Sequence, residues 1–162
     1  MPGAGMRAES VLRRMSLPVD ALCIQYVVEA YLAEHSVSLA HVLDADQMVR
    51  SYVDRLQHPP HTTIFSTLLQ AYAQYAYQDP VVAEPQADAL FRFWMIQHRN
   101  KVTAEEPTER DLWHWYQASP REGSEKCVEY HRLLCQLYDA QVIATRPSDD
   151  VLEAMMRNDT TQ

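Results

Sequence analysis

The stretch Tyr26-Val27-Val28-Glu29-Ala30-Tyr31 recurs 41 residues later as Thr67-Leu68-Leu69-Gln70-Ala71-Tyr72. Both copies end in Glu or Gln, then Ala, then Tyr, after two aliphatic residues. A weaker third copy, His114-Trp115-Tyr116-Gln117-Ala118-Ser119, follows after a further 47 residues. Similarity at a spacing of about 40 residues is typical of helical-repeat proteins. The spacing therefore predicts helical hairpins that stack on one another and share a core.

Prolines occur at matching points of these copies. Pro18 and Pro59 each precede the alanine of their copy by 12 residues, and Pro107 precedes Ala118 by 11. Proline interrupts a helix because it lacks the backbone N–H and restricts the residue before it. Each predicted unit is therefore a proline, a helix, a loop and a second helix. The alternative is an ordinary helical bundle in which the matching residues coincide by chance.

Apolar residues recur at helical spacing along most of the chain, and no segment alternates like a β-strand. The predicted fold is all-α: an α-solenoid of about three helical hairpins, similar to pentatricopeptide or tetratricopeptide arrays, plus a short terminal helix. In the first hairpin the predicted core stripe includes Leu22 and Tyr26. The predicted helices cover residues 19–34, 44–57, 62–77, 86–101, 108–119, 125–142 and 149–157.

Capping residues and prolines predict where several of these helices begin. Asp44 or Asp46 is a plausible N-cap for the second helix. A proline-containing linker is predicted from Gln78 to Gln86. Thr108 and Asp111 have the spacing of a capping box. Helix 86–101 is apolar on nearly every side, which predicts that it is central and buried.

The predicted organisation is an N-terminal segment of residues 1–17, a helical-repeat domain of residues 18–157 and a tail of residues 158–162. Residues 1–5 are expected to be disordered. Residues 6–17 contain three arginines and a single acid, Glu9. This composition predicts a short first helix or arm, and the alternative is an organelle-targeting segment, to which it is weakly similar.

Composition excludes several classes of protein. The chain has 162 residues, 14 basic and 22 acidic, with a formal net charge of −8. Since phosphate neutralisation dominates affinity for nucleic acid, this charge disfavours RNA or DNA binding. No apolar run is long enough for a transmembrane helix. The cysteines Cys23, Cys127 and Cys135 form no CxxC motif and are expected to be reduced thiols.

The repeat pattern resembles the pentatricopeptide-repeat family, whose unit is a helical hairpin followed by a proline. The best matches are Thr63 to Tyr72, Ala87 to Met95 and the junction Arg146-Pro147-Ser148-Asp149. The resemblance covers about residues 18–157. The units here are longer than the family's unit, which leaves a tetratricopeptide-like or unclassified helical repeat open.

The pentatricopeptide family binds single-stranded RNA in organelles, reading bases with a polar side chain early in each first helix. The aligned positions here are Gln25, Ser66 and Trp113. Gln25 and Ser66 have hydrogen-bonding groups, whereas Trp113 offers only stacking. Residues 19–34 and 62–77 contain no Lys or Arg. RNA binding is therefore the alternative interpretation, and binding of a protein on the solenoid surface is preferred.

In its mass of 18.7 kDa, its helix-only pattern and its loss of base-reading residues, the chain is similar to one class of pentatricopeptide-like subunit. These are the subunits on the catalytic head of mitochondrial ATP synthase in euglenozoan protists. The resemblance implies a non-catalytic accessory subunit that contacts the ATP synthase α subunit. It also implies a location in the mitochondrial matrix, peripheral to the inner membrane. Other mitochondrial assemblies are the alternative hosts.

Aromatic residues provide the candidate partner-binding positions. Tyr72, Tyr75 and Tyr77 span little more than one helical turn, so they cannot all face one core. Aromatic side chains are also enriched at the energetic centres of protein interfaces. The alternative for the tryptophans is that they line the core. The predicted partner-binding residues are Tyr75, Tyr77, Trp113 and Trp115.

No catalytic residue, cofactor or metal site is predicted. The run His58-Pro59-Pro60-His61 lacks the third ligand that a zinc site requires. The pairs Glu105-Glu106 and Asp149-Asp150 lie at helix starts, where capping and the helix dipole explain them. Nucleotide-binding, hydrolase and metalloprotease motifs do not occur in the sequence. An enzyme built from scattered residues is a further alternative.

Overall fold

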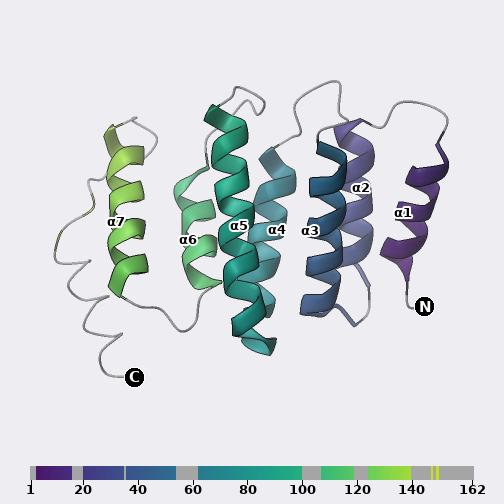
Figure 1. Cartoon of the computed structure of the whole chain (residues 1–162), viewed down its shortest axis with the longest axis horizontal. Coiled ribbons are helices and arrows are strands. Elements are labelled where there is room, and N and C mark those ends of the chain that lie inside the picture. Colours follow the sequence, from purple (N-terminus) through teal and green to yellow (C-terminus); the bar gives the residue numbers. More distant parts are fainter. Residues whose placement is uncertain are drawn as a thin grey trace.

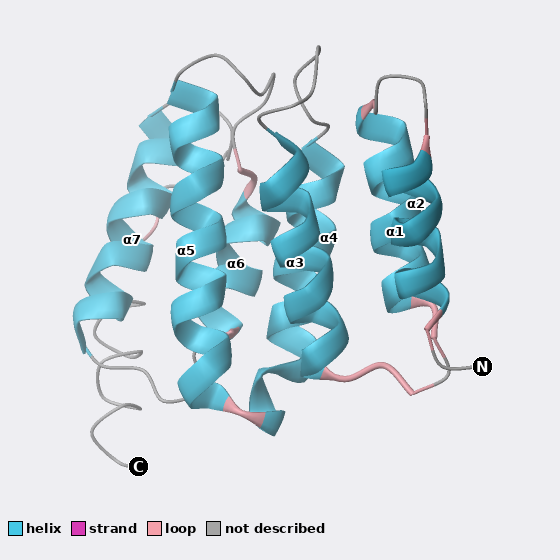
Figure 2. Cartoon of the chain, turned by 45° about the vertical axis from the view of Figure 1, so that its right-hand side comes forward, coloured by secondary structure: helices cyan, strands magenta, loops and turns pink. Residues whose placement is uncertain are grey.

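The computed structural model describes residues 3–15, 20–34, 36–53, 62–99, 107–118 and 124–139, together with Pro147 and Asp149. Over these residues the structure contains helices and no β-strand (Figure 2). This confirms the predicted all-α fold. The helices are α1 (Ala4–Arg14), α2 (Ala21–Leu32), α3 (Leu39–Val53), α4 (Thr62–Tyr75), α5 (Pro80–Arg99), α6 (Glu109–Gln117) and α7 (Ser124–Asp139), with the 3₁₀ helix η1 (Ala76–Gln78) between α4 and α5.

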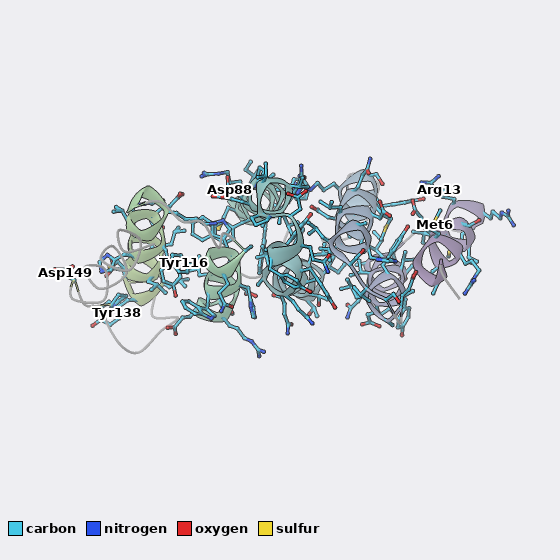
Figure 3. The ribbon with its side chains drawn as sticks, turned by 90° about the horizontal axis from the view of Figure 1, so that it is seen from below. Met6, Arg13, Asp88, Tyr116, Tyr138 and Asp149 are labelled. Atoms are coloured by element: carbon cyan, nitrogen blue, oxygen red, sulfur yellow. The ribbon has the colours of Figure 1, made fainter. Side chains whose placement is uncertain are left out.

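The helices stand side by side in sequence order (Figure 1). Seen along their axes, α1, α3 and α5 form one layer, and α2, α4 and α6 form a second (Figure 3). Each helix contacts the next along the chain, and helices of one layer also contact each other, as α4 does with α6. This packing of helical hairpins agrees with a small α-solenoid. No helix of the described residues is both long enough and apolar enough to cross a membrane.

Stacked aromatic rings fill the centre of the array. Phe65 of α4 stacks on Trp94 of α5 with 5.5 Å between ring centroids. Phe91 of α5 stacks on Trp115 of α6 at 5.0 Å. The predicted burial of helix 86–101 is therefore confirmed for one face, but Ile96 on the other side of α5 is 51% exposed.

Helix α3 begins at Leu39, five residues before the earlier of the two predicted caps. Polar side chains already satisfy backbone N–H groups at this point: Ser38 donates its N–H to Nδ1 of His41 at 3.1 Å. The N–H of Leu39 donates to Oε1 of Gln78 at 2.8 Å. The prediction that Asp44 or Asp46 caps this helix is therefore wrong.

Helix α5 begins at Pro80 and continues through Pro85, so the predicted linker from Gln78 to Gln86 is wrong. Pro80 occupies the first helical position, where no intrahelical N–H bond is needed. Pro85 removes the hydrogen bond to the carbonyl of Val81. Both Val81 and Pro85 are exposed, so that carbonyl faces water and the helix continues.

Helix α1 packs tightly on α2, so the expected disorder of residues 1–5 is wrong for Gly3, Ala4 and Gly5. Gly3 is the N-cap, with a φ of 95° that favours glycine. Gly5 is buried beneath the ring of Tyr31, and a Cβ atom added at Gly5 would lie 2.1 Å from Cδ1 of that ring. A glycine is therefore what allows α1 to approach α2 this closely.

The carboxylate of Glu34 holds the start of α1 against the turn between α2 and α3. It accepts the N–H of Gly3 at 3.3 Å and the N–H of Gly5 at 3.0 Å. Nε2 of His41 lies 3.0 Å from the same carboxylate. The hydrogen bond from Gly5, followed by that from Gly3 and the charge of His41, holds the pKa of Glu34 below its usual value, although burial opposes this shift.

Glu34 is expected to make the fold acid-sensitive. A carboxyl whose pKa is lowered in the folded state stabilises it above the unfolded pKa of about 4.3. That contribution is lost as the pH falls through the lower, folded value. The difference in free energy of unfolding between wild type and Glu34→Gln, measured with urea from pH 7 to pH 3, should therefore shrink on acidification. Glu29→Gln, on the exposed face of α2, should give a small difference at every pH, and parallel curves for both variants would contradict the expectation.

Three carboxylates connect neighbouring helices in the same way: one joins α1 to α2, one joins α3 to α4 and one joins α5 to α6. We call each carboxylate, together with its arginine and its aromatic donor, a carboxylate bridge. In each, an acid on the odd-numbered helix pairs with an arginine four residues later and accepts a hydrogen bond from an aromatic residue on the following helix. The donor atom is a tyrosine hydroxyl in the first two sets and the indole Nε1 in the third. The carboxylate bridges are Glu9–Arg13–Tyr31, Asp46–Arg50–Tyr72 and Asp88–Arg92–Trp115.

The middle carboxylate bridge is the most buried. The side chain of Asp46 is 3% exposed, against 16% for Glu9 and 34% for Asp88. Both oxygens of Asp46 accept from Arg50 at 2.8 Å, and the Tyr72 hydroxyl donates to it at 2.5 Å. Burial nevertheless raises the pKa of Asp46, against the opposing effect of Arg50 and Tyr72.

The arginine of the carboxylate bridge also reaches the next helix of its layer. Arg50 donates to the backbone carbonyl of Gln86 in α5 at 3.2 Å. Arg92 lies 3.5 Å from the carboxylate of Glu129 in α7. These two carboxylate bridges are therefore connected through their arginines to the next odd-numbered helix.

The carboxylate bridges change the alignment of the third repeat copy. Trp115 donates to Asp88 where Tyr72 donates to Asp46. The structure therefore aligns His114 with Ala71, whereas the sequence pattern aligned Ala118, four residues later.

Several predicted features lie outside the described residues: Pro18, Pro59, residues 54–61, Glu105-Glu106, residues 140–142, the terminal helix 149–157 apart from Asp149, and the tail 158–162.

Candidate protein-binding surface

The four predicted partner-binding residues lie in different environments. Tyr77 is 72% exposed and Trp113 is 43% exposed. Tyr75 is half-buried against the core. Trp115 is 1% exposed. The prediction is therefore wrong for Trp115, because its ring stacks on Phe91 and its Nε1 belongs to a carboxylate bridge.

The indole of Trp113 belongs to an aromatic cluster between α6 and α7. It stacks on Tyr116, with 5.7 Å between the centroids and 22° between the planes, and it lies 6.2 Å from Tyr130. Tyr116 extends from α6 towards α7 (Figure 3) and lies 4.8 Å from Tyr130. Burial, with a smaller contribution from the charge of Glu109, raises the pKa of Tyr130 to about 12. The exposed indole therefore rests on neutral aromatic rings. Because these rings already restrict its rotamers, it loses little conformational entropy on binding a partner.

Tyr77 is followed within five residues by two exposed valines that the sequence pattern placed in a linker. Val81 is 73% exposed and Val82 is 38% exposed, at the start of α5. Neither valine was predicted as a surface residue, because Pro80 and Pro85 favour a loop in the sequence pattern. These residues add apolar surface at the turn between α4 and α5.

The outer face of α2 carries two further exposed apolar residues. Leu22 is 51% exposed and Tyr26 is 60% exposed, so their predicted place in the core is wrong. Ile24, Val27, Val28 and Tyr31 face the core instead. Since Leu22 and Tyr26 are one turn apart, they form a short apolar stripe on the second layer.

The three positions aligned with RNA-reading residues lie on α2, α4 and α6. Gln25 and Ser66 each precede the tyrosine of their carboxylate bridge by six residues. The residue six before Trp115 is Glu109, a carboxylate, and Trp113 is not the equivalent residue. Neither α2 nor α4 contains a lysine or arginine. These two helices therefore lack the phosphate-binding charge that single-stranded RNA requires, whereas α6 carries the exposed Arg110 one turn before Trp113.

A cleft between α5, α6 and α7 has an apolar lining. Its cavity is about 260 Å³ in volume, and none of its lining side chains is titratable. Among the described residues, no group of three or more histidine, cysteine or acidic side chains is placed to hold a metal ion. The lining residues are Phe91, Met95, Pro107, Leu112, Leu133, Gln136 and Leu137.

Comparison of the chain with models of known protein families, with curated proteins and with solved structures finds no match.

Proposed function

We propose that the chain is a non-catalytic subunit that binds another protein through the outer face of α2, α4 and α6. The observation that carries this proposal is the exposed indole of Trp113, which rests on Tyr116 and Tyr130. Tryptophan on a rigid support is typical of the energetic centre of a protein interface. The lack of lysine and arginine on α2 and α4, together with the exposed carboxylate of Glu29 on α2, favours a protein partner over RNA.

We further propose that the partner is the α subunit of mitochondrial ATP synthase, in the catalytic head that faces the matrix. The mass of 18.7 kDa, the helical-hairpin array and the pentatricopeptide-like sequence pattern support this proposal. The chain would attach to the head without contributing catalytic residues. Another mitochondrial assembly is the alternative host.

Native-gel fractionation of mitochondria from the source cells, with mass spectrometry of each band, tests this proposal. The chain is expected to co-migrate with ATP synthase, to stay on the detached catalytic head and to be unaffected by nuclease. Migration with another complex would overturn the choice of partner. A band that nuclease disperses would overturn protein binding in favour of RNA binding.

Trp113→Ala is expected to weaken binding to the isolated catalytic head about 30-fold or more, which corresponds to a loss of at least 2 kcal/mol. Gln47→Ala is the control, because Gln47 is exposed on α3 in the other layer, away from the proposed surface, and it should change the dissociation constant less than about threefold. Surface plasmon resonance measures both values, and thermal unfolding of each variant shows whether the array is intact. Equal affinities for wild type and Trp113→Ala would rule out this surface.

A further inference from the structure

Three side chains that could act together lie near one another at the C-terminal end of the described helices: His131 and Cys135 on α7, and Asp149 after it. Nδ1 of His131 lies 3.8 Å from Sγ of Cys135, one turn later on α7. Nε2 of His131 lies 3.6 Å from Oδ1 of Asp149. In Figure 3, Asp149 lies beyond α7, on the side away from α6. The three groups therefore form a sequence of thiol, imidazole and carboxylate at the C-terminal end of the array.

This arrangement contains the groups needed to activate a thiol. The thiolate is the reactive form of cysteine, and an adjacent imidazole is a suitable acceptor for its proton. The carboxylate of Asp149 lies beside the other ring nitrogen without accepting a hydrogen bond from it, and its negative charge favours the imidazolium form. The side chain of His131 is 15% exposed, whereas Cys135 is partly exposed, so a small reagent has access to the sulfur.

We propose that Cys135 is a site of reversible modification by low-molecular-weight disulfides. The proton of the thiol passes to Nδ1 of His131, and the thiolate attacks one sulfur of the reagent. A new disulfide forms on Cys135 as the disulfide of the reagent breaks. The released thiolate takes the proton from His131. Cys135 is thereby oxidised and the released thiol is reduced, and a second thiol reverses the exchange.

Cys23 provides an internal comparison because it has the opposite environment. It is also partly exposed, but it lies at the start of α2 beside its N-cap, Asp20. The thiol hydrogen bond to Asp20, and then burial, raise the pKa of Cys23. The carboxylate beside Cys23 therefore disfavours its thiolate, whereas the neighbour of Cys135 is an imidazole whose Nδ1 lies 3.8 Å from the sulfur.

The test uses the folded full-length chain with oxidised glutathione at neutral pH, followed by site-resolved mass spectrometry. Cys135 should gain glutathione about tenfold faster than Cys23, a modest effect for a positioned base. Dithiothreitol should remove the modification. Equal rates at the two cysteines, or a faster rate at Cys23, would overturn the proposal.

Two variants connect the reactivity to the imidazole. His131→Gln should slow modification of Cys135 about tenfold and leave the rate at Cys23 unchanged. Arg132→Gln, which removes a neighbouring positive charge from α7, should change neither rate. An unchanged Cys135 rate in His131→Gln would overturn the role of the imidazole. If both cysteines react faster in His131→Gln, the variant has lost its fold, and the comparison passes to Asp149→Asn, where an unaltered ratio of the two rates would overturn the three-residue arrangement.

Discussion

Replacing Asp46 with alanine is expected to lower the free energy of unfolding by about 3 kcal/mol. The change leaves the Tyr72 hydroxyl without the acceptor it has at 2.5 Å and Arg50 without its two 2.8 Å hydrogen bonds. Removing one member of a buried charged set is costly because its partners stay desolvated and unpaired. Urea denaturation, followed by circular dichroism at 222 nm, measures the loss.

Asp88→Ala is the matched control for this prediction, because Asp88 occupies the same position in the third carboxylate bridge. Its side chain is 34% exposed and that of Arg92 is 58% exposed, so water replaces much of what the substitution removes. The expected loss is about 1 kcal/mol or less. Equal losses for the two variants would show that burial does not determine the strength of a carboxylate bridge.

Gly5→Ala is expected to destabilise the docking of α1 on α2 by about 3 kcal/mol. Alanine is the better helix former by roughly 1 kcal/mol, so propensity alone predicts the opposite sign. The added Cβ atom, however, would lie 2.1–2.7 Å from three atoms of the Tyr31 ring. That ring cannot move away without breaking its hydrogen bond to Glu9, at 2.6 Å. Hydrogen exchange of the α1 amides, together with urea denaturation, measures the effect.

A Tyr31→Ala background tests whether the ring causes this loss. Without the ring, the same Gly5→Ala change should be neutral or slightly stabilising, because only helix propensity remains. The double-mutant cycle should therefore give a coupling of the same size as the original loss. A Gly5→Ala penalty that persists without the ring would contradict the explanation.

The sequence was sufficient to predict α2 to α7, because the spacing of apolar residues determines which segments can bury a face, whereas α1 was only one of two interpretations of residues 6–17. It was less informative where a helix has apolar residues on several sides. Around α2 the apolar residues allow more than one choice of buried face, and contacts with α1 and α3 bury Ile24 and Val28 while leaving Tyr26 exposed. The prolines Pro80 and Pro85 led to a wrong prediction of a linker, because a proline ends a helix only where the hydrogen bond that it removes is needed.

The carboxylate bridges have a sequence signal that was overlooked. Glu9, Asp46 and Asp88 are each followed by an arginine four residues later. Acid–arginine pairs at this spacing are common on exposed helices, where they stabilise only slightly. What distinguishes these three is the aromatic donor on the next helix, and helix packing alone places it there. The same limit applied to the candidate surface, where two tryptophans two residues apart could not be assigned to opposite sides of α6 without knowing its neighbours.

The carboxylate bridges join residues that are close in sequence: 22, 26 and 27 residues separate the carboxylate from its aromatic donor. Closing such short loops has a small entropic cost and favours rapid folding. On the ribosome, each of the helix pairs α1–α2, α3–α4 and α5–α6 has all the groups of its own carboxylate bridge as soon as its second helix emerges, before the next pair is synthesised. The array can therefore be assembled from its N-terminal end during translation, each completed hairpin offering a folded surface to the one that follows.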